Sequence, residues 1–166
     1  MKHPNRIYIL GTSGTGKSYL GKILSEKYSL PFLDSDDIMF IKKFSKSRTR
    51  EQRKKKLDKI ARNKKWIIDA RGSDWSIGPM KKADLIVWLQ FNLFTRTWRI
   101  LKRYFSRKGK YDEDFKSIWN LLKYSWSYKI SDKLSGYKFH RKFIKENKLN
   151  PVIIKTNRQL KRFLRE

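Results

Sequence analysis

The stretch of sequence that decides the fold is Gly11-Thr12-Ser13-Gly14-Thr15-Gly16-Lys17-Ser18. It fits the pattern G-x-x-x-x-G-K-[ST], which is typical of a loop that holds phosphate groups. An apolar run at residues 7–10 comes just before it and predicts a buried strand. An amphipathic run at residues 20–28 follows it and predicts a helix. Strand, loop and helix in that order indicate a P-loop rather than a simple glycine-rich turn.

Each part of this loop has a chemical role. Its glycines let the backbone approach phosphate oxygens, and successive N–H groups form an anion-binding nest at the start of a helix. We expect Lys17 to reach the β- and γ-phosphates of ATP and Ser18 to ligate Mg²⁺. The residues expected to bind the nucleotide are Gly11, Thr12, Ser13, Gly14, Thr15, Gly16, Lys17, Ser18 and Tyr19.

Composition limits the class of protein. The chain has 166 residues, of which 39% are hydrophobic and 14% aromatic, so we expect one folded domain over residues 1–166. It has no cysteine, which excludes disulfides and thiolate metal sites and suits the cytoplasm. Neither a leader-like segment nor an apolar run of the roughly 20 residues needed to span a membrane is present.

The charge balance is strongly basic. Lys and Arg number 42 against 15 Asp and Glu, which gives a formal net charge of +27. Such a surface attracts polyanions, namely nucleotides, nucleic acid or an anionic membrane. The alternative is a general lysine bias that only adds solvated charge.

Acidic residues follow the second and third predicted strands. Asp34, Asp36 and Asp37 follow one strand, and Asp69 ends the next. Because open α/β sheets bind ligands at the carboxyl ends of their strands, these carboxylates are expected to face the P-loop. We expect Asp34 or Asp69 to help Ser18 with Mg²⁺, and Asp36 to orient or deprotonate an acceptor hydroxyl. The alternatives are that Asp36 or Asp37 caps the next helix and that Asp69 caps a loop.

Basic residues crowd the segment at about 37–65, which we interpret as a helical insert on the acceptor side of the sheet. The run is a solvated face, a clamp on an acceptor phosphate or a nucleic-acid patch. Arg71, in the loop after the third strand, is expected to grip the acceptor.

A helix is predicted at residues 93–108. Its apolar face, which we expect in the core, comprises Phe94, Trp98, Leu101 and Phe105. Its opposite face carries Arg96, Arg103 and Arg107, with Arg99 beside them. Because guanidinium groups match phosphate oxygens, we expect Arg103 and Arg107 to neutralise the γ-phosphoryl charge from a lid at about 103–115.

The remaining apolar runs complete an α/β pattern. Five short parallel strands are predicted at residues 7–10, 32–33, 66–69, 85–89 and 151–156. Two helices are expected within residues 111–147, with Phe115, Trp119 and Trp126 in the core rather than stacked on bases, and a last helix is expected at 158–165. The resulting fold class is α/β with three layers: a parallel sheet lies in the middle, and helices cover both of its faces. A small helical lid is added to this fold.

The whole pattern resembles the small P-loop kinases of the adenylate kinase type, and is most similar to a related group known as DNA topology modulation proteins. The resemblance is carried by the P-loop, the Asp-rich strand end and residues 66–69, 83–89, 98–103, 115–120 and 159–164. It implies a P-loop NTPase fold with strand order 2-3-1-4-5, ATP with Mg²⁺, an acceptor pocket over strands 2 and 3, and lid arginines within residues 99–107. Asp34-Ser35-Asp36 is also similar to the acceptor and Mg²⁺ motif of shikimate-type kinases.

The chain departs from that group near the acceptor side. Ala70-Arg71-Gly72 follows Asp69 where the group has Gly-Asn-Tyr, and Gln90 and Asn92 stand where it has Asp and Pro. The acceptor signature Asp-Gly-Phe-Pro-Arg of adenylate kinases is absent. These departures argue against AMP as the acceptor.

The leading hypothesis is a phosphotransferase that moves the γ-phosphoryl group of ATP to a nucleotide or another small hydroxylated or phosphorylated acceptor. The expected catalytic residues are Lys17, Asp36, Arg103 and Arg107, the acceptor ligands Asp34, Asp36 and Arg71, and the metal ligands Ser18, Asp69 and Asp34. The alternative is a nucleic-acid-binding protein that uses the P-loop as an ATP switch, or a kinase that acts on nucleic-acid ends along residues 42–65.

Overall fold

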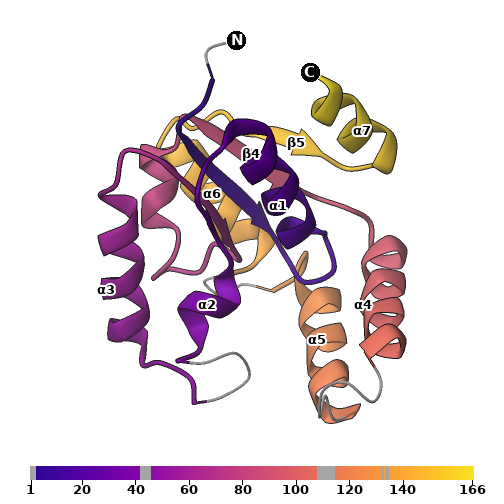
Figure 1. Ribbon diagram of the computed structural model, residues 1–166. Helices are drawn as coiled ribbons and strands as arrows, with labels where there is room; N and C mark the ends of the chain where they lie inside the picture. Colours follow the sequence, from indigo (N-terminus) through magenta and orange to yellow (C-terminus); the bar gives the residue numbers. More distant parts are fainter. Residues whose placement is uncertain (1–2, 42–45, 108–114, 132, 134) are drawn as a thin grey trace.

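The fold is a five-stranded parallel sheet between two layers of helices (Figure 1). A computed structural model describes residues 3–41, 46–107, 115–131, 133 and 135–166. The strands are β1 (Arg6–Gly11), β2 (Phe32–Leu33), β3 (Trp66–Ala70), β4 (Leu85–Leu89) and β5 (Val152–Ile154). Their order is β2-β3-β1-β4-β5, and every pairing is parallel. The predicted strands and their order are confirmed.

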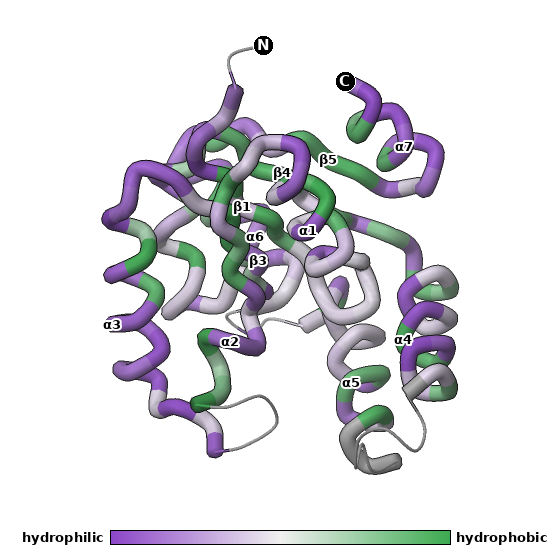
Figure 2. Tube along the Cα trace, in the orientation of Figure 1, coloured by the Kyte–Doolittle hydropathy of each residue, from purple (hydrophilic) through white to green (hydrophobic). Residues whose placement is uncertain are grey.

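Helices cover both faces of this sheet. They are α1 (Lys17–Tyr28), α2 (Ser35–Met39), α3 (Arg50–Ala61), the 3₁₀ helix η1 (Gly78–Lys82), α4 (Leu93–Arg107), α5 (Phe115–Ser127), α6 (Tyr137–Glu146) and α7 (Asn157–Arg165). In Figure 1, α1 lies in front of the sheet and α6 behind it. Figure 2 shows largely hydrophobic strands and a largely hydrophilic α3. None of the described helices is long and apolar enough to cross a membrane.

The central strand β1 separates two cores because its side chains alternate between the faces. Ile7 and Ile9 point into a core that includes Leu20 and Leu24 of α1 and Leu160 of α7. Tyr8 and Leu10 point into the other core, which includes residues of α2, α3 and η1 and is covered by aromatic side chains of α6. Because β1 is buried on both faces, nearly all of its side chains are apolar, as predicted from the sequence.

Local capping explains where several helices begin. Thr49 and Gln52 form a capping box at the start of α3, and Thr156 and Gln159 form one at α7. The cap of α2 is Asp34, whose carboxylate accepts a hydrogen bond from Asp36 N at 2.9 Å. The predicted caps, Asp36 or Asp37, were therefore wrong, and Asp36 lies inside the first turn with its carboxylate free of the cap.

The orientation predicted for α4 is wrong. The side chains expected in the core but found exposed are Phe94 (81%), Trp98 (61%) and Phe105 (66%). Arg96 and Ile100 are buried instead. Arg96 can face inward because its Nη1 donates to Ser125 O of α5 at 2.7 Å, so its buried polar group is satisfied. The periodicity predicts the helix but not which face is covered.

Helix α5 packs against α4 around a small separate core of Ile100, Ile118 and Leu122. Trp119 and Trp126, which were predicted to be core residues, are each 41% exposed. Most of the predicted lid, residues 108–114, lies outside the described residues, as do the side chains of Arg107 and Phe115.

Candidate active site at the carboxyl edge of the sheet

The P-loop has the backbone conformation that its glycines predict. Gly14 and Gly16 have φ values of 78° and 90°, in the left-handed region that disfavours other residues. A Cβ atom at Gly14 would lie 2.5 Å from Arg96 O, so only glycine fits between the loop and α4. The Thr15 hydroxyl donates to Thr12 O at 2.8 Å and closes the loop on itself.

Helix α4 holds the P-loop from outside through its arginines. Arg99 Nη1 donates to Thr15 O at 2.8 Å, and its Nη2 donates to Asn157 Oδ1 at the start of α7 at 2.7 Å. The guanidinium also lies 4.2 Å from the ring centre of Phe91. Arg99 therefore fixes the loop relative to two helices.

The metal-binding candidates meet at the start of α1. Ser18 Oγ donates to Asp69 Oδ2 at 2.7 Å, although 51 positions separate the two residues. Asp69 is fully buried, and its Oδ1 atom has no hydrogen-bond partner within the described part of the chain. Burial raises the pKa of Asp69, and the charge of Lys17 opposes that rise.

Lys17 lies within the same buried region. Its Nζ donates to Thr12 O at 3.2 Å, and burial lowers its pKa while the charge of Asp69 opposes that shift. A buried ammonium group has lost its contact with water, and an anion bound beside it would compensate for that loss. This is the position that the sequence predicts for the phosphate-binding lysine.

Asp36 lies at the centre of the charged groups. Its pKa is raised by burial and by the charge of Asp34, and is opposed by Arg71, Arg103 and Lys17. The charges of Asp34, Arg71, Arg103 and Lys17 all act on Asp36, so the structure brings these groups close to it. A raised pKa makes a carboxylate a stronger base, which is the property needed to take a proton from a hydroxyl group.

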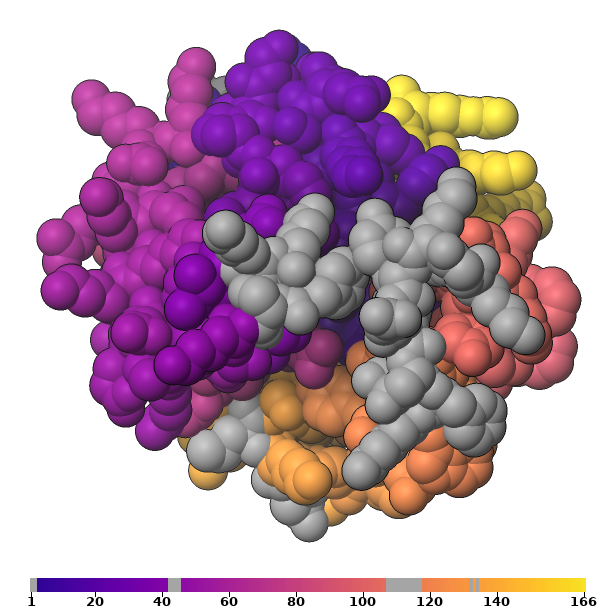
Figure 3. Space-filling view, turned by 60° about the horizontal axis from the view of Figure 1, so that its bottom comes forward, coloured from indigo at the N-terminus to yellow at the C-terminus, as the bar shows by residue number. Residues whose placement is uncertain are grey.

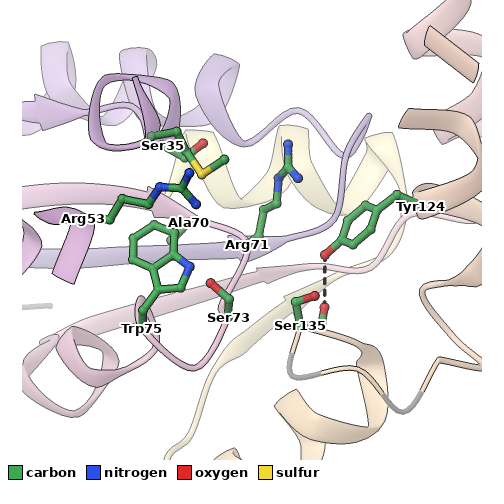
Figure 4. Close-up of a pocket in the computed structure, with 9 residues that line it drawn as sticks. Ser35, Arg53, Ala70, Arg71, Ser73, Trp75, Tyr124 and Ser135 are labelled. Carbon is green, nitrogen blue, oxygen red and sulfur yellow. Dashed lines mark hydrogen bonds between the residues drawn. The ribbon is translucent and has the colours of Figure 1, made fainter. Parts of the chain in front are cut away.

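A pocket opens between α2, α3, the loop after β3 and α5. It has a volume of about 150 Å³ and is lined by Ser35, Met39, Arg53, Ala70, Arg71, Ser73, Trp75, Tyr124 and Ser135. Figure 4 shows Arg53 beside Trp75 and Arg71 beside Tyr124. The guanidinium carbons lie 6.0 Å and 5.3 Å from those ring centres. A guanidinium stacked on a ring keeps its N–H edge for an anion.

Some predicted residues stand apart from this crevice. The Tyr19 side chain is 62% exposed on α1, although the residue follows the loop directly. Arg107 ends α4, but its side chain is outside the described residues. Figure 3 shows α3 on one side of this edge of the molecule and α4 with α5 on the other.

Sequence reasoning missed three pocket residues, Arg53, Trp75 and Tyr124. Arg53 is hidden in the basic run of α3, and its Nε atom is buried without a hydrogen-bond partner among the described residues. Trp75 and Tyr124 look like ordinary apolar residues of a loop and a helix. Only the packing of α3, the loop after β3 and α5 brings the three together.

The strand order and the loop at residues 11–18 define a P-loop fold. The family model for shikimate kinase matches residues 13–69, from the P-loop to Asp69. Shikimate kinase from Acinetobacter baumannii in complex with shikimate has a similar structure, with a TM-score of 0.54 and 20% identity over 94% of this chain and 85% of that chain. At this identity the likeness shows the fold.

Two relatives are similar in sequence. An uncharacterized protein, YqaC of Bacillus subtilis, is 36% identical over 104 residues, which are 62% of this chain and 58% of that protein. Shikimate kinase of Sulfurihydrogenibium is 31% identical over 103 residues, with 54% of this chain and 62% of that protein covered. The chain thus spans about three fifths of the length of the curated relatives it matches. These comparisons support a P-loop kinase and leave its acceptor unspecified.

Proposed function

We propose that this chain transfers the γ-phosphoryl group of ATP to the hydroxyl group of a small acceptor that carries an anionic group. The observation that supports it most is the convergence of Lys17, the Ser18–Asp69 pair and Asp36 at one edge of the sheet. Phosphoryl transfer needs positioning and charge neutralisation more than covalent chemistry. The crevice offers both beside a pocket of acceptor size.

The residues fit Mg²⁺ and ATP. Ser18 Oγ and the buried Asp69 Oδ1, which has no hydrogen-bond partner among the described residues, are hard oxygen donors, which Mg²⁺ prefers. A Mg²⁺ ion held by one or two side chains takes its other ligands from substrate phosphates and water. Mg²⁺ bound there would offset the charge of the phosphates. The P-loop N–H groups and Lys17 would bind the phosphates.

On the acceptor side, the carboxylate of Asp36 would orient the acceptor hydroxyl and take its proton as the phosphoryl group is transferred. Arg103, whose charge acts on Asp36, would offset the charge that develops on that group. Arg53 and Arg71, each beside an aromatic ring, would bind the anionic group of the acceptor. A carboxylate or phosphate fits two such guanidinium edges.

The test is ATP consumption with a panel of acceptors: nucleosides, nucleoside monophosphates, small hydroxy acids, sugar phosphates and oligonucleotide 5′ ends. Stimulation by an anionic hydroxy compound, with transfer of labelled γ-phosphate, supports the proposal. Stimulation by uncharged nucleosides alone would contradict the anionic acceptor, and equal ATP hydrolysis without transfer would contradict the kinase. The resemblance to the adenylate kinase type stays a prediction, which nucleoside monophosphates test.

Nucleic-acid ends remain the second candidate because of α3. This helix is rich in basic side chains. Among them, Lys54 pairs with Asp58 at 2.9 Å, and Lys56 Nζ donates to Asp37 O at 2.7 Å. Phosphorylation of oligonucleotide ends that weakens steeply with salt, while small acceptors stay inert, would favour it.

A further inference from the structure

The loop that carries Arg71 is held by a chain of buried hydrogen bonds that the proposed chemistry does not use. Trp88 Nε1 lies 3.2 Å from the Tyr128 hydroxyl, which lies 2.8 Å from His140 Nδ1. His140 Nε2 lies 3.0 Å from Gly72 O. The four residues come from β4, the end of α5, α6 and the loop after β3.

The chemistry of its two ends fixes the direction of this chain. An indole N–H only donates, so the Tyr128 oxygen accepts from Trp88. The Gly72 carbonyl only accepts, so His140 must carry a proton on Nε2. In a neutral ring with its proton on Nε2, Nδ1 is unprotonated and accepts a hydrogen bond from the Tyr128 hydroxyl. The connected groups thus specify one neutral tautomer of His140.

Burial supports the same neutral state. His140 is fully buried, and burial lowers its pKa to about 4 while hydrogen bonds to the backbone of Gly72 and Arg71 oppose that shift. The ring therefore stays neutral across the physiological range.

Gly72 is pressed against this ring. Its φ of 71° is in the left-handed region, and a Cβ atom would lie 2.7 Å from His140 Nε2 and 2.4 Å from Leu10 Cδ1. The backbone directly after Arg71 is therefore clamped between the imidazole and β1. The guanidinium of Arg71 lies over Tyr124, one helical turn before Tyr128.

The same turn of α5 also contacts the donor side. Ser125 O accepts from Arg96 Nη1 at 2.7 Å, and Ser125 Oγ donates to Ser13 O of the P-loop at 3.4 Å. The end of α5 thus contacts the P-loop through one residue and the Arg71 loop through its neighbours.

We infer that Trp88, Tyr128 and His140 form a chain of hydrogen bonds, here called the positioning relay, that fixes the Gly72 carbonyl. By fixing this carbonyl, the relay positions Arg71 to bind the acceptor. The relay acts through Arg71 and does not touch substrate. The role of Arg71 in binding the acceptor rests on the function proposed above, whereas the relay's hold on the loop is independent of it.

The test compares Tyr128→Phe with Tyr137→Phe. The first removes the central hydroxyl of the relay and keeps the ring. The second removes a hydroxyl outside the relay from a ring that packs on both Trp88 and Tyr128. The chain has two histidines, so imidazole ¹⁵N spectra resolve His140 from the exposed His3.

We expect wild type and Tyr137→Phe to show the Nε2–H tautomer of His140, unchanged between about pH 5 and pH 8. Tyr128→Phe is expected to keep the Nε2–H tautomer, which the Gly72 carbonyl still requires, to shift the ¹⁵N resonance of Nδ1 because that atom loses its hydrogen-bond donor, and to speed amide exchange at residues 71–74. Its KM for the acceptor should rise about tenfold, as loss of one positioning hydrogen bond implies, with KM for ATP within about twofold.

Three results would overturn the relay: an Nδ1–H tautomer in the wild type, unchanged exchange at residues 71–74 in Tyr128→Phe, or equal rises in both KM values. If the wild type transfers no phosphoryl group to any acceptor, the proposed function fails, and the tautomer and exchange measurements still decide the relay.

Discussion

The donor side and the acceptor side of the crevice are built in different ways. The donor side is one continuous loop, residues 11–18, joined to Asp69 by a single hydrogen bond. The acceptor side takes Arg53 from α3, Arg71 from the loop after β3 and Tyr124 from α5. The difference teaches that the proposed nucleotide site is a local property of the chain, whereas the pocket proposed for the acceptor is a property of its tertiary packing.

The largest effect that would break this comparison is expected at Lys17. Lys17→Ala should lower kcat about a thousandfold because it removes the buried cation beside the phosphates. The melting temperature should not fall, since burial already lowers the pKa of this lysine and its removal relieves a desolvation cost. Transfer assays and thermal unfolding measure both, with the exposed Lys22→Ala on α1 as the control. Near-normal transfer in Lys17→Ala would rule out the donor site.

A smaller loss is expected when the carboxylate that pairs with Ser18 is neutralised. Asp69→Asn should lower kcat about a hundredfold and shift the Mg²⁺ dependence to higher concentration, since an amide is a poorer ligand. Rates measured over a Mg²⁺ titration test this, and Asp58→Asn on the surface of α3 is the matched control. An unchanged Mg²⁺ dependence would place the ion elsewhere.

A substitution on the acceptor side should have a smaller effect, and it should change the KM of the acceptor only. Arg71→Lys keeps the charge but loses the planar group beside Tyr124, so we expect KM for the acceptor to rise about tenfold with KM for ATP unchanged. Steady-state kinetics with each substrate varied in turn tests this. Arg62→Lys, exposed after α3, controls for the substitution, and a parallel rise in both KM values would show that the two sides are not separable.

The smallest effect concerns the outer face of α4. Phe94→Ser should change the free energy of unfolding by no more than about 0.5 kcal/mol because the side chain is exposed. Ile100→Ala, on the covered face next to the P-loop, should cost about 3 kcal/mol. Urea unfolding of both variants measures the difference. A reversed ranking would restore the orientation predicted from the sequence.

Sequence reasoning succeeded where one physical rule decided the outcome. Short apolar runs such as residues 85–89, bounded by polar residues, favour buried strands of a parallel sheet, and the glycines of the P-loop permit a conformation that other residues resist. The position of Asp69 beside Ser18 followed from the rule that strand ends of one sheet meet at one edge.

It failed where two rules compete. The prediction for α4 placed its aromatic face in the core and its arginines on the opposite face, but Arg96 and Arg99 find carbonyl acceptors on α5 and the P-loop, which the sequence does not reveal. Asp34 caps α2 in place of its neighbours because the helix begins earlier than its apolar residues indicate. The pocket around Arg53 and Tyr124 depends on contacts between segments far apart in the chain.

The exposed aromatic side chains of α4 should also influence how strongly copies of the protein associate in solution. The side chains of Phe94, Trp98 and Phe105 are apolar and exposed, so they favour association between copies of the chain. The net charge of +27 opposes association, because the copies repel one another. Salt shortens the range of that repulsion to about 8 Å at 0.15 M but leaves apolar attraction intact. The protein should therefore be most dispersed in dilute buffer and associate as salt is added, and light scattering against ionic strength would follow that change.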